Sequence, residues 1–448
     1  MKTLKITLFV ILYFTHRLDA QNQIVVSGSL MNKENMEPVC LAHVYIAEQM
    51  IGSISNTNGD YTLRLPMTDK SDTLIFSHVG FKTEKIVINF NHDTLINLSL
   101  TSCSIILPEY IVSNMTVKAL FDSVLSHLKD NYSSKPVLLD VFMRVRVVNK
   151  SNPRSFNTGN ALGEFALQIY KNSYIDLNRN NNQLKDQVKY IEWQKYDSLL
   201  KSEGDLYFIL FSQLLPFMDN LNNISNNFIY NKKWVKANDI YIDGIETYQH
   251  GEAYRLVYKH KENAKGKAFE GKLLIDKNSF ALVSYERYFR PEGVAYEALK
   301  TELLQMPFNR FEEADYIKHE YEKIGNTWYL KSIYLIYKET KQYVNGGFLG
   351  ESYFEGVNES LEKASVESYS EAIFVVTKVD TNKVKKFKEE ELLNLKDIKP
   401  FHITSNNVEF HKKYNTIDNS DLDLWIRATR AASKKYEKKI REELEKEE

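Results

Sequence analysis

Short apolar segments separated by turn signals recur from residue 24 to residue 100, and this pattern constrains the fold more than any other sequence feature. Segments 41–46 and 61–65 alternate in the two-residue period of a β-strand. Asn58-Gly59 lies just before the second of these, and Asn-Gly is a strong hairpin signal because both residues tolerate positive φ. Several short strands so close together predict an antiparallel β-sandwich.

Four blocks follow one another in this region: Ser27-Gly28, the run from Glu37 to Ile46, the run from Gly52 to Tyr61 and the run from Asp72 to Lys82. In this order and spacing they resemble the carboxypeptidase regulatory-like domain, a module abundant in exported Bacteroidetes proteins. The resemblance implies a transthyretin-like sandwich and an exported, envelope-associated protein. It does not imply peptidase activity, because in metallocarboxypeptidases the module accompanies a separate catalytic domain.

The first 20 residues have the layout of a secretory signal peptide. Lys2 and Lys5 precede an apolar run at 6–14, and a polar stretch then closes on Ala20. The apolar run has about half of the roughly 20 residues that a membrane-spanning helix needs. We therefore expect cleavage near Ala20, no transmembrane helix afterwards, and a periplasmic or outer-membrane-associated protein in a Gram-negative bacterium.

The apolar segments after residue 137 are longer and keep the same period. Residues 252–260, 269–275 and 327–338 are examples, and turns such as Gly325-Asn326 join neighbouring segments. They predict a second, larger antiparallel sheet. The paired segments look like the curved sheet of periplasmic lipoprotein-carrier half-barrels, which hold acyl chains against an inserted helix.

Helical spacing occurs in three places. It predicts one helix at 117–131, which ends before Pro136. Similar spacing within 185–218 predicts an insertion packed over the sheet. The mixed-charge run at 422–448 predicts an exposed terminal helix supported by i,i+4 ion pairs.

The predicted fold class is mainly β: an N-terminal antiparallel β-sandwich, a short linking helix, a larger antiparallel β-sheet domain in the form of a half-barrel with a helical insertion, and a helical C-terminal tail. The chain divides into residues 1–20 (signal peptide), 21–104 (carboxypeptidase regulatory-like sandwich), 105–136 (linker and helix), 137–380 (larger antiparallel domain with the insertion at 185–218) and 381–448 (charged, partly helical tail).

Charge and cysteine content narrow the function classes. The 58 Lys+Arg residues nearly balance the 59 Asp+Glu residues, which argues against nucleic acid as a partner. Cys40 and Cys103 are the only cysteines, in a chain expected to enter an oxidising compartment. A disulfide between them and a pair of thiols are both open; we favour the thiols, because a bridge requires Cα atoms within about 7 Å.

One pair of residues has the spacing of metal ligands. His319 and Glu322 form a His-x-x-Glu motif on a predicted strand, where residues i and i+3 point to opposite faces. The pair therefore could not hold one metal ion. The sequence contains no nucleophile elbow, no His-Glu-x-x-His helix and no phosphate-binding glycine loop. We accordingly predict no cofactor, no metal and no enzymatic activity.

Aromatic residues are frequent, with 28 Tyr and 24 Phe. On the predicted strands some tyrosines could line a concave face and bind a lipid, glycan or peptide, because they combine a large contact area with a polar group. The alternative is ordinary sheet packing, since aromatic residues favour strands. The candidate ligand-binding residues are Tyr254, Tyr258, Tyr285, Tyr288 and Tyr334.

The favoured function is non-catalytic binding or scaffolding in the cell envelope, with a lipid or lipoprotein held in a groove of the larger domain. An envelope lipid, a glycan or a protein could be the partner. Two alternatives remain: a protein associated with an outer-membrane β-barrel, or a hydrolase whose site is dispersed over the fold. A pocket that unites a histidine, a carboxylate and a nucleophile would favour the hydrolase.

Overall fold

The structure is a computed structural model. It describes residues 23–46, 51–68, 70–78, 80–89, 91–102, 115–132, 135–151, 162–175, 187–196, 232–248, 250–261, 269–289, 314–343, 364–381, 384–385, 387–388, 390 and 415–417. None of the described helices has the length and hydropathy that a membrane span requires.

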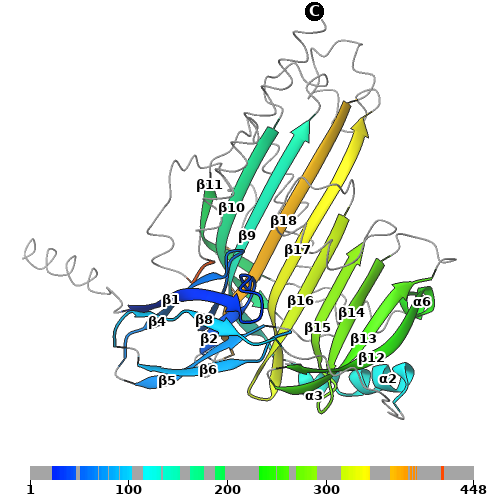
Figure 1. The fold of residues 1–448 in the computed structure, drawn as a ribbon, viewed down its shortest axis with the longest axis horizontal. Helices are drawn as coiled ribbons and strands as arrows, with labels where there is room; N and C mark the ends of the chain where they lie inside the picture. Colours follow the sequence, from blue (N-terminus) through cyan, green and yellow to red (C-terminus); the bar gives the residue numbers. More distant parts are fainter. Residues whose placement is uncertain are drawn as a thin grey trace, which may run out of the picture.

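The described elements are mostly strands (Figure 1). They are β1 (Gln23–Asn32), β2 (His43–Ile46), β3 (Ile51–Ile54), β4 (Asp60–Pro66), β5 (Ser71–Ser77), β6 (Glu84–Asn89), β7 (Thr94–Leu95), β8 (Leu98–Leu100), α2 (Val117–Ser126), α3 (Leu128–Asn131), β9 (Val137–Ser151), β10 (Leu162–Ile175), β11 (Gln187–Tyr196), α6 (Lys232–Ala237), β12 (Asn238–Tyr248), β13 (Gly251–His260), β14 (Phe269–Asp276), β15 (Leu282–Phe289), β16 (Ala314–Ile324), β17 (Thr327–Tyr343) and β18 (Ala364–Asp380).

Strands β1–β8 form a β-sandwich, called here the N-terminal domain. One of its sheets has the order β4-β1-β7, with β8 also paired to β1, and the other has the order β3-β2-β5-β6. All pairs are antiparallel except those that β1 makes with β7 and β8. Alternate residues of the two sheets, such as Val26, Val44, Leu63 and Phe76, meet in one buried apolar core.

The turn predicted at Asn58-Gly59 is present and joins β3 to β4, but the prediction of a hairpin is wrong, because β3 pairs with β2 and β4 pairs with β1 in the other sheet. The side-chain oxygen of Asn56 accepts hydrogen bonds from the backbone N–H groups of Asn58 and Asp60. Gly59 has a φ of +82° and sits where an added Cβ would meet the carbonyl oxygen of Leu30 at 2.4 Å, so only glycine fits. The turn therefore fixes the register of β4 against β1.

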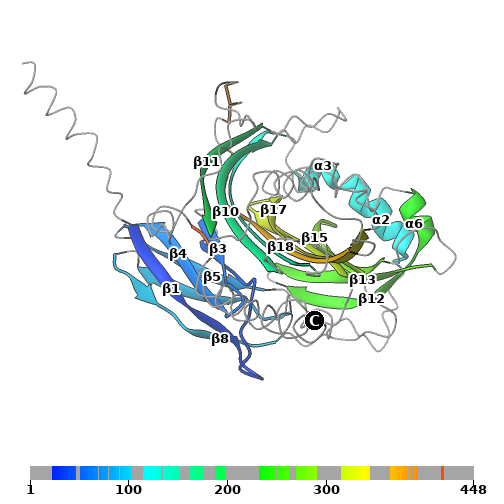
Figure 2. The same cartoon turned by 90° about the horizontal axis from the view of Figure 1, so that it is seen from above.

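The larger domain is one curved antiparallel sheet, called here the curved sheet. Its order is β12-β13-β14-β15-β16-β17-β18-β9-β10-β11. Figure 2 shows the sheet bending around α2, α3 and α6, which lie on its concave face. The N-terminal domain lies beside the opposite, outer face. The predicted fold class is thus confirmed for the sandwich, the linking helix and the larger antiparallel domain.

Helix α2 matches the predicted linking helix. Thr116 caps its N-terminus by accepting a hydrogen bond from the backbone N–H of Ala119. Its buried face, made of Leu120, Phe121 and Val124, packs on apolar residues of the curved sheet. The helix ends at Ser126, and the single turn α3 follows.

The insertion predicted at 185–218 is wrong in its first part, because Gln187–Tyr196 is the strand β11. The register of β10 on β11 shifts so that Ile191 is an extra residue, a β-bulge. The rest of this insertion, and nearly all of the predicted helical tail, lies outside the described residues.

One short tail segment, 415–417, is described and lies on the N-terminal domain. The side chain of Asn415 accepts a hydrogen bond from the backbone N–H of Arg64 at 2.6 Å and donates one to the Arg64 carbonyl oxygen at 3.1 Å. The hydroxyl of Ser53 donates to the carbonyl oxygen of Thr416 at 3.0 Å. The tail thus contacts both β3 and β4.

The two domains share a sheet. Strand β18 pairs with β17 from Ala364 to Val375, and then Lys378 on the same strand pairs with Ile51 of β3. The other edge of β18 is occupied by β9 throughout, so β3 takes over the edge that β17 leaves. The sheet therefore forks at β17, β18 and β3, and we call this point the fork.

Candidate functional site

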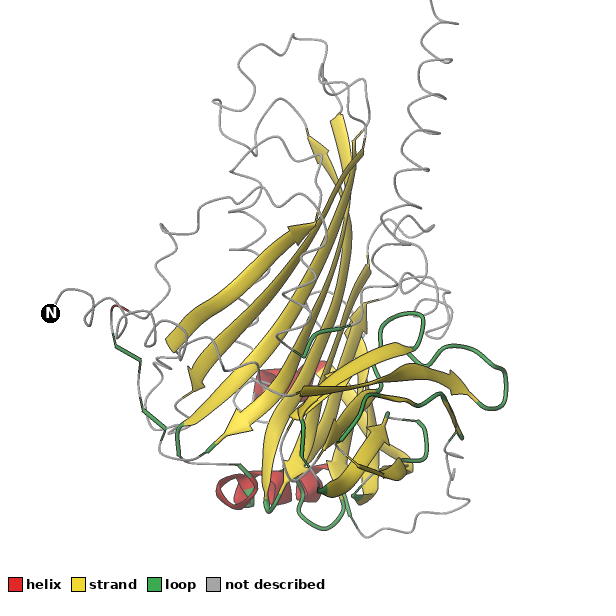
Figure 3. Cartoon of the chain, turned by 90° about the vertical axis from the view of Figure 1, so that its left-hand side faces the viewer, coloured by secondary structure: helices red, strands yellow, loops and turns green. Residues whose placement is uncertain are grey.

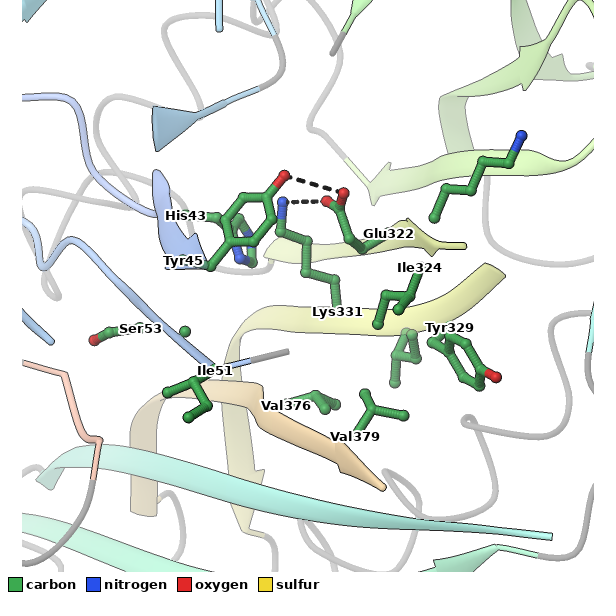
Figure 4. Close-up of a pocket in the computed structure, with 13 residues that line it drawn as sticks. His43, Tyr45, Ile51, Ser53, Glu322, Ile324, Tyr329, Lys331, Val376 and Val379 are labelled. Atoms are coloured by element: carbon green, nitrogen blue, oxygen red, sulfur yellow. Dashed lines mark hydrogen bonds and ion pairs between the residues drawn. The ribbon is translucent and has the colours of Figure 1, made fainter. Parts of the chain in front are cut away.

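A half-enclosed pocket lies at the fork (Figure 4). Each of the two diverging strands carries a β-bulge there: Lys331 is the extra residue on β17, and Thr377 is the extra residue on β18. Bulges re-aim side chains and end regular pairing, and they are frequent next to functional sites. They explain why two long strands that pair over twelve positions separate at this point.

The pocket has a cavity volume of about 50 Å³. Its floor is apolar, and part of it belongs to the core of the curved sheet: Leu330 and Val379 are buried members of that core, and Val376 packs against it. Charged and polar groups line the opposite wall. The lining residues are His43, Tyr45, Ile51, Gly52, Ser53, Glu322, Lys323, Ile324, Tyr329, Leu330, Lys331, Val376 and Val379.

Glu322 is the centre of the polar wall. Its carboxylate accepts a hydrogen bond from the Tyr45 hydroxyl at 3.1 Å and lies 2.8 Å from Nε2 of His250. Lys331 Nζ is 2.7 Å from the second carboxylate oxygen and lies over the Tyr45 ring, 4.8 Å from its centroid. Burial would raise the pKa of Glu322, but Lys331 and His250 outweigh it and lower the pKa to about 2.

A second buried carboxylate, Glu320, joins the N-terminal domain to β16. One oxygen lies 2.7 Å from Lys318 Nζ, and the other lies 3.1 Å from Nε2 of His43. Desolvation opposes its ionisation, yet Lys318 and His43 hold the pKa of Glu320 well below its usual range. His43 itself is 5% exposed, and burial together with Lys331 lowers its pKa to about 4.

Ser332 completes a serine, histidine and carboxylate cluster, which is the combination that would favour a hydrolase. Its hydroxyl lies 3.2 Å from Nε2 of His43 and 3.2 Å from Glu320. In a catalytic relay the two ring nitrogens face different partners. Here Nε2 faces both groups, and it must carry its hydrogen because it points at an ionised carboxylate. His43 therefore cannot accept a proton from Ser332 through this nitrogen.

The structure divides the five candidate tyrosines between the two faces of the curved sheet. Tyr258 and Tyr285 are 1% exposed on the concave face, where Tyr258 donates a hydrogen bond to the carbonyl oxygen of Glu286 at 3.3 Å. Tyr254 packs against the same core. The hydroxyl of Tyr334 donates to Glu371 on the outer face, and that of Tyr288 lies 3.5 Å from Glu270. Ligand binding by any of the five stays a prediction.

Gly271 explains the position of Tyr258. It is the cross-strand partner of Tyr258, and a Cβ at this glycine would lie 2.5 Å from the tyrosine hydroxyl. The absence of a side chain therefore lets the Tyr258 ring lie across β14 and reach Tyr285, whose ring is parallel to it at 6.5 Å. No sequence pattern predicted this arrangement of Gly271 with the rings of Tyr258 and Tyr285.

His319 lies beside these tyrosines. It is 1% exposed, and its ring meets Tyr285 edge-on with a centroid separation of 5.7 Å. Among the described residues, neither of its ring nitrogens has a hydrogen-bond partner. Burial, with a smaller contribution from Arg287, lowers its pKa to about 3, so the ring is neutral and offers one donor and one acceptor.

The prediction that His319 and Glu322 point to opposite faces of one strand is confirmed. His319 faces Tyr285 on the concave side, and Glu322 faces Tyr45 of the N-terminal domain. Within the described ranges, no three His, Cys, Asp or Glu residues form a group that could hold a metal ion. Cys103 lies outside the described residues, so a disulfide with Cys40 stays untested.

The charged contacts between the domains could not be predicted from the sequence. His43 and Glu320 are separated by 277 residues, and no spacing rule connects them. A signal did exist on β16, where charged residues at 318, 320 and 322 alternate with apolar or aromatic ones. That pattern indicates a polar face, but it does not distinguish a face covered by another domain from one in water.

Comparison with known proteins identifies one domain. The family model of the CarboxypepD_reg-like domain matches residues 26–112. No curated protein matches the chain.

Several solved structures are similar at low sequence identity. A DUF1329 family protein from Desulfovibrio piger is 12% identical, with 62% of this chain and 99% of that chain covered and a TM-score of 0.25. A protein domain from Vibrio parahaemolyticus, described as outer membrane lipoprotein-sorting, is 8% identical, with 60% and 96% covered and a TM-score of 0.23. A DUF3823 family protein from Bacteroides ovatus is 9% identical, with 39% and 97% covered and a TM-score of 0.15.

At TM-scores this low, the similarities bear on neither ligand nor activity. The family match agrees with the sequence blocks and with the sandwich that they form. Residues 26–112 of this chain are therefore a CarboxypepD_reg-like domain, which is joined at the fork to a curved antiparallel sheet.

Proposed function

We propose that the protein is a non-catalytic binding protein of the cell envelope, and that its curved sheet holds a lipid or the acyl part of a lipoprotein on the concave face. The observation that carries this proposal is the apolar concave face that several strands of the curved sheet build together. Leu256, Leu273, Ile333 and Phe374 from four strands share the core on which α2 packs.

The lengths of the elements support this reading. Strands β17 and β18 have 17 residues each, which corresponds to roughly 55 Å of strand. Helix α2 has 10 residues and spans roughly 15 Å. Figure 3 shows the described helices gathered at one end of the long strands. Among the described elements, helices therefore cover only part of the concave face.

An apolar ligand suits this face better than a glycan does. Sugar binding relies on exposed aromatic faces flanked by polar groups. Among the aromatic rings described on the concave face, those of Tyr258, Tyr285 and Phe374 are almost fully buried. The signal-peptide layout and the CarboxypepD_reg-like domain support the envelope as the location.

The test is whether the full chain retains lipid. Organic extraction of the purified protein followed by mass spectrometry should give close to one lipid per chain, and a fluorescent fatty-acid analogue should bind saturably. Leu335→Asn, on the concave face, should weaken binding, whereas Tyr241→Asn should not, because Tyr241 is 53% exposed and its neighbours Ile240 and Ile242 are the ones that pack on the core. Protein without lipid and without saturable binding would refute the proposal.

A further inference from the structure

We propose that the pocket at the fork is the entrance through which one acyl chain reaches the concave face, and that the ligand is a single-chain amphiphile with a zwitterionic headgroup. This inference rests on the function proposed above and names both the ligand class and its route. It arises from the position of the pocket between two apolar cores and from the charges on its wall.

The floor of the pocket is continuous with the concave core. Leu330 and Val379 line the pocket and are also buried in the core on which α2 packs. Val376 and Ile324 line the pocket and pack against that core. An alkyl chain in the pocket would therefore contact the same side chains as a chain on the concave face.

The volume of the pocket favours one acyl chain over two. An apolar cavity of about 150 Å³ accommodates a benzene ring. The pocket, at about 50 Å³, is smaller than such a cavity. It fits the end of a single methylene chain, whereas a ring or two parallel acyl chains would require the fork to open.

The polar wall selects the headgroup. The Glu322 carboxylate and the Lys331 ammonium lie 2.7 Å apart, so a negative and a positive charge stand side by side. Figure 4 shows this pair with Tyr45 on one side of the pocket and Ile324, Val376 and Val379 on the other. A headgroup with a single charge would meet one like charge, which costs binding energy, whereas a zwitterion can oppose both. Lys331 has donors left for a phosphate oxygen after its contact with Glu322.

The first part of the test concerns the route. Val376→Phe fills the pocket, and Val87→Phe is the matched control, because Val87 is 71% exposed on β6 of the N-terminal domain. With lysophosphatidylethanolamine as the zwitterionic probe and a monoacylglycerol as the uncharged probe, Val376→Phe should weaken binding of both about tenfold or more. Val87→Phe should leave both unchanged.

The second part concerns the headgroup. The wild type should bind the zwitterionic probe about tenfold more tightly than the uncharged one. Lys331→Met should remove most of this preference, so that the two probes bind with similar affinity. Lys277→Met is the control, because Lys277 forms an ion pair of the same 2.7 Å length with Glu252 and is absent from the pocket lining.

If Val376→Phe does not fold, cross-linking of the wild type with a photoreactive single-chain lipid tests the route through the pocket. Cross-links from a photoreactive group on the part of the acyl chain next to the headgroup should map to residues 324, 329, 376 and 379 of the wild type. Normal binding by folded Val376→Phe, or cross-links confined to other strands, would overturn the route while leaving the proposed function intact. Equal affinity of the wild type for both probes would overturn the headgroup. Binding of neither probe by the wild type would overturn the proposed function as well.

Discussion

The two faces of β16 differ in whether their buried polar groups have partners among the described residues. On the outer face Lys318, Glu320 and Glu322 are at most 9% exposed, and each has a charged partner within 3 Å. On the concave face His319 is equally buried, and no described residue pairs with either of its ring nitrogens. The outer face is therefore a completed joint with the N-terminal domain. The concave face keeps hydrogen-bonding capacity that a bound ligand could use.

The largest expected effect comes from removing Glu320, which pairs with His43 of the N-terminal domain and with Lys318. Glu320→Ala should lower the free energy of unfolding by about 3–5 kcal/mol, because it leaves Lys318 and His43 buried without their carboxylate. Denaturant unfolding of the variant measures the loss. The control is Asp122→Ala, which removes an exposed i,i+4 partner of Lys118 and should cost less than about 0.5 kcal/mol. Equal losses for the two variants would mean that the joint does not stabilise the fold.

The pH dependence of stability should involve His43, which contacts the outer face of β16, and His319, which lies on the concave face. The folded-state pKa values of His43 and His319 are lowered to about 4 and about 3 by burial, from an ordinary value of 6.5. Their contribution is therefore complete above pH 6.5 and is lost as the pH falls towards these values. Between pH 7 and 5 each histidine should remove about 2 kcal/mol of unfolding free energy. Chemical denaturation at several pH values measures this loss, and His319→Leu should halve the part of it that the two histidines contribute between pH 7 and pH 5.

Replacing the two histidines by leucine should change stability in opposite directions. His43→Leu should cost about 2 kcal/mol, because Glu320 loses a hydrogen bond in a buried site. His319→Leu should stabilise the ligand-free protein by about 1 kcal/mol, because it removes two buried groups that have no partner in the described part of the chain. Thermal unfolding of the two variants, side by side with the wild type, shows the signs. A destabilised His319→Leu protein would show that the imidazole already has a partner.

The smallest expected difference concerns two tyrosine hydroxyls. Tyr334→Phe on the outer face should cost about 1.5 kcal/mol, because the hydroxyl donates to the Glu371 carboxylate at 3.1 Å. Tyr258→Phe on the concave face should cost only about 0.5 kcal/mol, because its hydroxyl reaches neutral groups at 3.3 and 3.4 Å. Equilibrium unfolding in urea resolves the two values. A larger loss for Tyr258→Phe would reverse the comparison.

Local patterns in the sequence predicted the strands and the directions of their side chains. The two-residue period placed Val44 and Ile46 on one face of β2 and His43 and Tyr45 on the other, and the structure buries the first pair in the sandwich core and turns the second pair towards β16. The same rule separated His319 from Glu322. These predictions succeed because strand geometry depends only on neighbouring residues.

The candidate site could not be predicted, because it depends on contacts between distant segments and on breaks in regular pairing. The pocket lies where β3 replaces β17 beside β18, and the joining pair is Ile51 with Lys378. The bulge at Lys331 turns this side chain towards Glu322. The alternation of residues along β17 does not reveal this bulge. The charged residues at 318, 320 and 322 indicate a polar face, but their spacing does not show that His43 and Tyr45 of the N-terminal domain contact it.

An experimental structure of the full chain purified with its native lipid would show whether the concave face holds a ligand. We expect elongated density along the concave face, with one end at Val376 and Val379 in the fork and a polar group within reach of Lys331. A concave face filled by side chains from α2 to the far end of β17, with no density between helix and sheet, would contradict it.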